Sequence, residues 1–103
     1  MAEEMTSVGK AAEIADGEMA SFQVGGEDVA VANVGGSFHA FGDVCTHAQC
    51  LLSEGDLDGT VVTCPCHGSE FDVTSGAVRN GPATESVPSY PVVVDGDDLR
   101  IGL

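Results

Sequence analysis

Basic residues are scarce in this sequence. It holds Lys10, Arg79 and Arg100 against 17 acidic residues, which gives a formal net charge of −14, and it lacks tryptophan. Proteins that bind nucleic acid contact the phosphates through clustered Lys and Arg side chains. Three scattered basic residues therefore exclude nucleic acid as a partner. The charge instead favours a strongly solvated surface or a partner with a basic docking face.

Long apolar segments are also missing. No stretch approaches the about 20 consecutive apolar residues of a membrane-spanning helix. The first ten residues, MAEEMTSVGK, are acidic and lack the apolar core of a secretory signal. We therefore expect a soluble, cytoplasmic, monomeric protein without a membrane partner. The length of 103 residues indicates a single domain, residues 1–103. Because so small a domain buries only about 60–70% of its unfolded surface, a metal or cross-link would help to stabilise it.

Glycine-containing turns separate short β-branched or aromatic runs at a spacing of about 8–12 residues, which is typical of an all-β sandwich or barrel. The expected strands are residues 19–24, 28–34, 37–41, 60–63, 70–72, 92–94 and 99–101. Gly35 and Gly36 suit a two-residue hairpin, since a primed turn needs positive φ. Residues 95–98 predict a second hairpin. Residues 10–15 are the one candidate helix.

Four cysteines and two of the three histidines fall into two clusters, CTHAQC at residues 45–50 and CPCH at residues 64–67. The third histidine, His39, lies between Phe38 and Ala40 in an expected hairpin, and we interpret it as structural. Sixteen residues separate His47 from Cys64. Two matched clusters of metal-binding residue types in one small chain predict a metal site rather than core packing.

The local geometry indicates which of these residues share a target. The residue before a proline is extended, so Cys64 should end a strand, and Pro65 suits the second position of a β-turn. The first and fourth residues of such a turn approach each other, which lets Cys64 and His67 aim at one point. Cys45 and His47 share a face of an extended chain. Cys50 and Cys66 are then left over. A tetrahedral zinc site formed by two thiolates and two imidazoles remains an alternative at this point.

CTHAQC and CPCHGS resemble the two cluster-binding boxes of Rieske iron–sulfur proteins, and Gly81-Pro82-Ala83 is similar to the proline loop of that family. The resemblance implies a small Rieske-type β-sandwich with a cluster-binding tip formed by two loops, and one 2Fe–2S cluster. It also implies that Cys45 and Cys64 ligate one iron and His47 and His67 the other. Gly81 and Pro82 would then lie close to the cluster.

The ligand set has a chemical consequence. An oxidised 2Fe–2S core carries two positive charges, so two thiolates and two neutral imidazoles leave the assembly neutral, whereas four thiolates would leave it dianionic. Adding an electron is then less opposed by negative charge. The expected reduction potential lies within about −150 to +300 mV, compared with about −400 mV for all-cysteine ferredoxins.

The resemblance further implies a soluble one-electron carrier without catalytic residues of its own. It would pass electrons from a flavin-dependent ferredoxin reductase to the terminal oxygenase of an aromatic-ring dioxygenase system. Glu54, Asp43 and Asp72 are candidates for docking acids. The alternative is a Rieske subunit, or a soluble fragment of one, from a respiratory or arsenite-oxidase-like complex.

Three features bear on that choice. Cys50 and Cys66 occupy the positions that form a disulfide in high-potential Rieske proteins, and Ser69 resembles a serine that donates a hydrogen bond to a bridging sulfide there. Phe71 stands where that type has a tyrosine that bonds a cysteine sulfur. We therefore predict a reduction potential between those of the two types.

Overall fold

The computed structural model describes residues 5–46, 50–66 and 68–102. Within them the chain forms short strands and two 3-10 helices, η1 (Ala11–Glu13) and η2 (Leu52–Glu54). The strands are β1 (Met5–Lys10), β2 (Met19–Val24), β3 (Glu27–Val34), β4 (Ser37–Gly42), β5 (Asp56–Asp58), β6 (Val61–Thr63), β7 (Glu70–Asp72), β8 (Val78–Asn80), β9 (Ser89–Tyr90), β10 (Val92–Asp95) and β11 (Asp98–Gly102).

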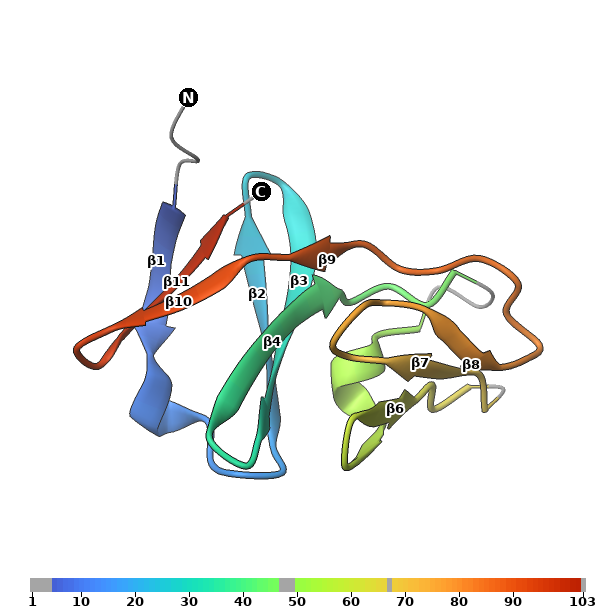
Figure 1. Ribbon diagram of the computed structural model, residues 1–103. Helices are drawn as coiled ribbons and strands as arrows, with labels where there is room; N and C mark the ends of the chain where they lie inside the picture. The colour runs from blue at the N-terminus through green and yellow to red at the C-terminus, as the bar shows by residue number, and fades with distance from the viewer. Residues whose placement is uncertain (1–4, 47–49, 67, 103) are drawn as a thin grey trace.

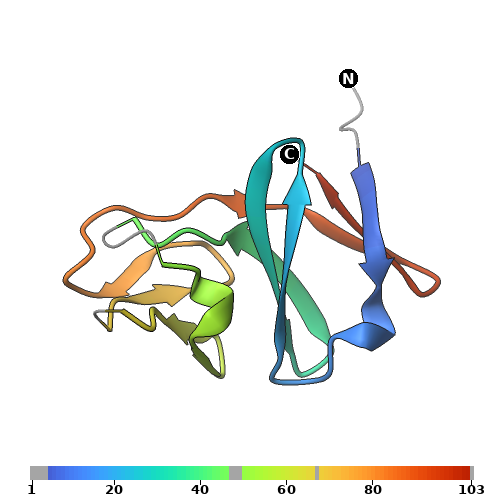
Figure 2. The same ribbon diagram turned by 180° about the vertical axis from the view of Figure 1, so that it is seen from behind.

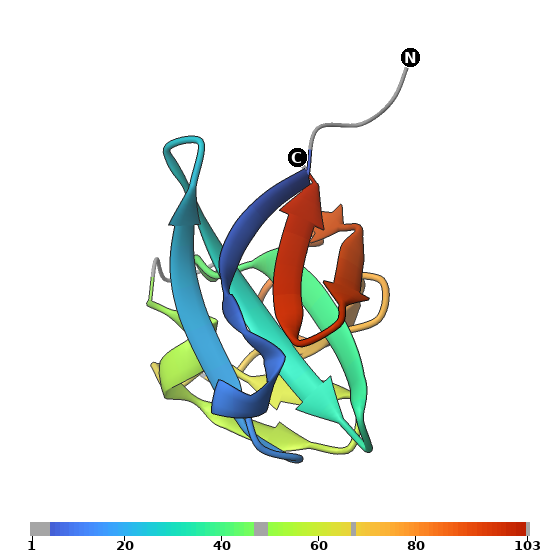
Figure 3. The same cartoon turned by 90° about the vertical axis from the view of Figure 1, so that its left-hand side faces the viewer.

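In this part of the chain the strands pair into three antiparallel sheets. We call them the outer sheet (β1-β11-β10), the middle sheet (β2-β3-β4-β9) and the tip sheet (β5-β6-β7-β8). The outer sheet packs beside the middle sheet, and the tip sheet lies at the opposite end of the molecule (Figures 1 and 3).

Strand β3 shows why the middle sheet lies between the two others. Val29 and Val31 belong to a buried cluster with Leu99 and Ile101 of the outer sheet. Ala30 and Ala32, which alternate with those valines, belong to a second buried cluster with the tip-sheet residue Phe71 and others. Successive side chains of a strand point to opposite faces. The middle sheet is therefore buried on both sides, with one hydrophobic core against each of its faces.

The tip sheet and its loops form one long excursion from the middle sheet (Figure 2). The chain leaves at Gly42, the end of β4, and returns at Ser89, the start of β9. These two points are neighbours, because Phe41 pairs with Ser89 and the N–H of Gly42 donates to the carbonyl of Pro88 over 2.8 Å. The site-bearing segment is thus fastened to the scaffold at both of its ends.

The predicted fold class is confirmed, and each predicted strand is present with bounds that differ by at most a few residues. Gly35 and Gly36 have φ values of 61° and 92°, as a primed hairpin turn requires. Residues Asp95 and Asp98 pair across the second predicted hairpin.

The candidate helix at residues 10–15 is present only as the single 3-10 turn η1. Lys10 ends β1, and the helix stops after Glu13 because Ile14 is extended, with φ −112° and ψ 102°, and is buried. Four strands were not predicted: β1, β5, β8 and β9. Each of them lies at the edge of its sheet, where a strand needs fewer apolar residues and leaves a weaker pattern in the sequence.

Candidate metal centre

The first loop, residues 44–51, carries CTHAQC and closes like a hairpin. Val44 and Leu51 form a bridge, and the N–H of Cys45 donates to the carbonyl of Cys50 over 2.8 Å. Asp43 and Cys45 are 0% and 1% exposed, whereas Val44 between them is 37% exposed. That alternation is what an extended chain produces. It turns the Cys45 side chain into the molecule.

The second loop, residues 64–69, carries CPCHGS and closes in the same way. The N–H of Cys64 donates to the carbonyl of Ser69 over 2.8 Å, and the N–H of Gly68 donates to the carbonyl of Cys64 over 3.2 Å. The fourth residue of the expected β-turn, His67, lies outside the described residues. Gly68 follows it with a φ of 78°, which suits glycine.

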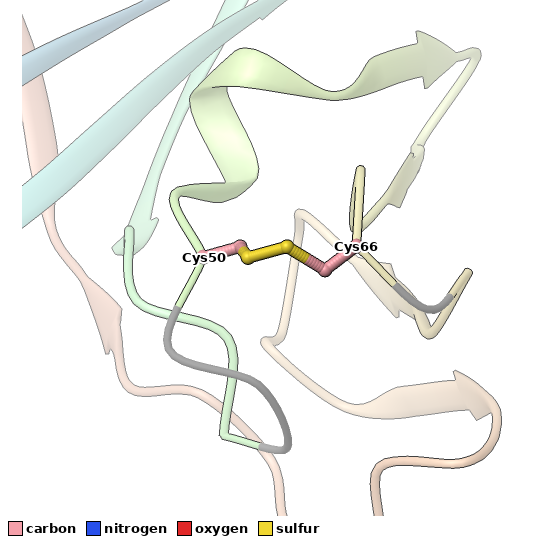
Figure 4. The surroundings of a disulfide bond; sticks show 2 residues. All are labelled: Cys50 and Cys66. Carbon is pink, nitrogen blue, oxygen red and sulfur yellow. A yellow bond between two sulfur atoms is a disulfide. The ribbon is translucent and has the colours of Figure 1, made fainter.

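The four sulfurs fall into two groups. Cys45 and Cys64 are 1% and 2% exposed and belong to the same buried cluster, so the two loops bring both thiols into one apolar region. Cys50 and Cys66 form a disulfide that ties the first loop to the second, with a Cα–Cα distance of 6.3 Å (Figure 4). Two buried thiolates from adjacent loops are soft ligands that suit iron–sulfur or zinc chemistry.

The other two predicted ligands, His47 and His67, lie outside the described residues. Within residues 5–46, 50–66 and 68–102, no group of three or more His, Cys, Asp or Glu is placed to hold a metal ion.

A third segment, residues 81–88, is fixed to both loops. Its Ala83 N–H donates to the Ser69 hydroxyl oxygen over 3.0 Å, and the Thr46 hydroxyl of the first loop donates to the Glu85 carbonyl over 2.6 Å. This segment begins at the predicted Gly81-Pro82 pair, whose peptide bond is cis, and Pro82 is exposed. The sequence analysis did not assign a role to Thr46. The one feature that could have indicated its role is that it is a hydroxyl residue within the CTHAQC motif.

Ser69 and Phe71 are both fully buried. Phe71 lies on β7 in the same buried cluster as Cys45 and Cys64. The Ser69 hydroxyl accepts a hydrogen bond from Ala83, so its own proton stays available for donation. Both residues are therefore buried in the part of the molecule that contains the two thiols.

The three candidate docking acids differ in exposure. Asp43 is fully buried, so its assignment as a docking acid is wrong. The hydroxyl and N–H of Thr74 hydrogen-bond to Asp72 and, with a smaller contribution from Arg79, hold the pKa of Asp72 below its ordinary value. Glu54 is exposed at the end of η2.

Residues 4–91 match the Rieske [2Fe-2S] domain family. The chain therefore belongs to the Rieske iron–sulfur family, and its cofactor is one Rieske-type 2Fe–2S cluster rather than a zinc ion. The buried thiols of the two loops fit such a group in number and in chemistry.

Two relatives come from different branches of that family. The ferredoxin component of biphenyl 2,3-dioxygenase from Rhodococcus jostii (strain RHA1) is 38% identical over 99 residues, covering 96% of this chain and 92% of the relative. The iron–sulfur subunit of the cytochrome b6-f complex from Chlorobaculum thiosulfatiphilum is also 38% identical, over 95 residues. That match covers 92% of this chain but only 51% of the subunit.

The similar solved structures include dioxygenase ferredoxins, like the first of these relatives. The ferredoxin of carbazole 1,9a-dioxygenase from Nocardioides aromaticivorans IC177 superposes with a TM-score of 0.91 at 31% identity, covering 94% of this chain and 95% of that one. A complex of reduced oxygenase and oxidized ferredoxin in carbazole 1,9a-dioxygenase contains a chain that matches with a TM-score of 0.90 at 34% identity, covering 95% and 92%. In the described part of the present chain, no helix is long and apolar enough to span a bilayer.

Proposed function

We propose that this protein carries single electrons within an aromatic-ring dioxygenase system, from a flavin-dependent ferredoxin reductase to the terminal oxygenase. The observation that carries the proposal is the near full-length match to a dioxygenase ferredoxin, at 38% identity over 96% of this chain and 92% of the relative. The chemistry of oxygen activation would belong to the partner, and the chain would supply no catalytic residue of its own.

In this proposal Cys45 and Cys64 hold one iron of the cluster, and His47 and His67 hold the other. When bound, the cluster accepts and releases one electron. The chain's own part is to keep its two cysteine ligands fixed and dry. The burial of both thiols excludes water from them, and the Cys50–Cys66 disulfide restrains the loops on which they lie.

The proposed partners would meet the protein at its tip, where the two loops and residues 81–88 come together. A net charge of −14 would guide the chain toward a basic docking face. Glu54 and the half-buried Asp72 remain candidate docking acids. We further propose that the protein acts as a cytoplasmic monomer and as one domain.

A second candidate is supported by the disulfide and by the relative from the cytochrome b6-f complex. In that case the chain would correspond to the cluster-bearing part of a respiratory or arsenite-oxidase-like complex, and its electron acceptor would be a cytochrome. The two candidates differ in their partners and in the range of their potentials.

The test begins with the purified protein. We expect iron and sulfide in equal amounts, a red-brown colour, and an electron paramagnetic resonance (EPR) signal after reduction with dithionite. Cys45→Ser should lose all three. A colourless wild-type protein with zinc instead of iron would contradict the cluster itself.

The second step measures electron transfer. Reduced protein mixed with the oxidised terminal oxygenase of a biphenyl dioxygenase system should lose its reduced spectrum as the oxygenase becomes reduced, and the rate should fall with added salt. Transfer to a c-type cytochrome but not to the oxygenase would favour the second candidate.

A further inference from the structure

Among the described residues, Asp43 is the one acidic side chain that is fully buried. Burying a carboxylate is costly unless hydrogen bonds compensate for the lost water. Here Ser53 provides two. Its N–H donates to one carboxylate oxygen over 2.7 Å, and its hydroxyl donates to the other over 2.8 Å. Hydrogen bonds to a charged acceptor are stronger than neutral ones, so this pair is a firm link between the two positions.

The backbone of Asp43 joins three parts of the chain. Its carbonyl accepts a hydrogen bond from the N–H of Leu52 over 2.7 Å, and its own N–H donates to the carbonyl of Asp28 over 3.0 Å. Asp28 lies near the start of β3, in the middle sheet. Asp43 thus anchors the base of the first loop to the scaffold on one side and to η2 on the other.

Cys45 lies two residues beyond Asp43 on the same inward-facing side of an extended segment. The next bond of this ladder is the one from the Cys45 N–H to the carbonyl of Cys50, which carries the disulfide. The bonds of Asp43 therefore close the loop immediately before Cys45. A change at Asp43 is transmitted to the cysteine through one extended residue, Val44.

We propose that Asp43 is a positioning residue of the electron-transfer site: through Ser53 it closes the first loop and fixes the Cys45 thiolate in the orientation that the cluster requires. This inference rests on the proposed role of Cys45 as a cluster ligand. An apolar side chain would pack at this buried position with no desolvation cost. The carboxylate instead accepts both Ser53 hydrogen bonds, which an apolar side chain cannot do.

The test compares three variants by protein-film voltammetry and EPR spectroscopy of the reduced protein. Asp43→Ala loses both side-chain bonds, and Ser53→Ala loses the hydroxyl bond only. Both should broaden the EPR signal and shift the reduction potential to more positive values, because water then reaches the loosened loop and favours the more negative, reduced state. Asp43→Asn keeps the shape, an acceptor for the Ser53 N–H and an amide N–H that can donate to the Ser53 hydroxyl oxygen, so its signal should stay close to the wild-type line shape.

Asn33 offers a matched control at a distance from the loops. It is 7% exposed, its amide donates to the Ile14 carbonyl over 2.8 Å, and its amide oxygen accepts from the Gly36 N–H over 2.8 Å. Asn33→Ala should lower the melting temperature without changing the potential or the EPR signal. If Asp43 only stabilised the fold, Asp43→Ala would likewise lower the melting temperature and leave the potential and the EPR signal unchanged.

The inference is overturned if Asp43→Ala keeps the wild-type potential and line shape, or, should that variant not fold, if Ser53→Ala keeps both. Failure of the proposed role of Cys45 as a cluster ligand is distinct from this result, because Cys45→Ser would then keep the iron–sulfur signal.

Discussion

Ser69 lies directly before β7 and Phe71 lies on it; both are fully buried, and Phe71 belongs to the same buried cluster as the two cysteine thiols. One retains a hydroxyl and the other lacks it. Hydrogen bonds to cluster sulfurs stabilise the reduced state, because that state is the more negative one. Adding a hydroxyl at residue 71 and removing the hydroxyl at residue 69 should therefore shift the reduction potential in opposite directions.

Phe71→Tyr should raise the reduction potential. The new hydroxyl would enter the buried cluster that contains Cys45 and Cys64 and would give a sulfur acceptor one more hydrogen bond. Voltammetry of the two proteins measures the change. Phe22→Tyr is the control, because Phe22 packs against the other core, where an added hydroxyl should leave the potential unchanged.

Ser69→Ala should lower the potential, because the variant removes a hydroxyl proton that is free to be donated. It also leaves the Ala83 N–H without its acceptor, and an unsatisfied buried donor costs about 1–3 kcal/mol. We therefore expect a lower free energy of unfolding as well. An unchanged potential together with reduced stability would show that Ser69 only fastens residues 81–88.

At the scale of residues, the residue type alone predicted a role where that role depends on the chemistry of a single side chain. Turn geometry left Cys50 and Cys66 without a shared target, and the resemblance to Rieske proteins implied the disulfide between them, which is present. Asp43 and Thr46 could not be assigned, since their roles depend on Ser53 and Glu85, whose proximity is set by the fold. An acidic residue beside a metal motif was expected to be a surface charge, and burial reversed that interpretation.

At the scale of elements, turns decide how the loops sit on the sheets. Gly76 follows β7 and has a φ of 80°, and a methyl group there would collide with the carbonyl of Val87. Its own carbonyl accepts the Val87 N–H over 2.9 Å. This glycine is therefore where the β7–β8 turn meets the end of residues 81–88.

Gly76→Ala should lower the free energy of unfolding clearly more than Gly59→Ala does, as chemical denaturation can measure. Both glycines have positive φ, but a Cβ at Gly59 would meet nothing within 4 Å. The control should therefore cost only the left-handed conformation, about 1–2 kcal/mol. Equal losses of unfolding free energy in the two variants would show that the backbone at Val87 moves aside for the new methyl group at no energetic cost.

Sequence patterns located the central strands and both hairpins, because these elements are buried or have turn glycines that mark their ends. The edge strands β5 and β8 carry few apolar residues, and their pairing follows from neighbours distant in the chain. The short β9 has only two residues and pairs because β4 lies next to it. The hydrophobic periodicity of a short segment does not reveal its pairing with strands that are distant in the chain.

At the scale of the whole molecule, charge is the dominant feature. Each of the three basic residues already forms an ion pair with an aspartate: Lys10 with Asp97, Arg79 with Asp72, and Arg100 with Asp95 and Asp98. A large excess of negative charge remains, and like charges repel one another across the compact fold.

Salt should therefore stabilise the protein. The melting temperature should rise between 0.01 M and 1 M sodium chloride, because the screening length falls from about 30 Å to about 3 Å over that range. The double variant Asp56→Asn/Asp58→Asn removes two exposed charges from β5 and should show a smaller rise. A melting temperature that falls with salt in both proteins would contradict this explanation.

The neighbouring exit and return points of the site-bearing segment, at Gly42 and Ser89, have a consequence for how this architecture can change. A segment whose two ends lie side by side can grow, shrink or be exchanged while the strands on either side keep their partners. Selection can therefore act on the redox-active part and on the supporting sheets almost independently. An engineer could use the same junction to transplant the tip between proteins as a single cassette.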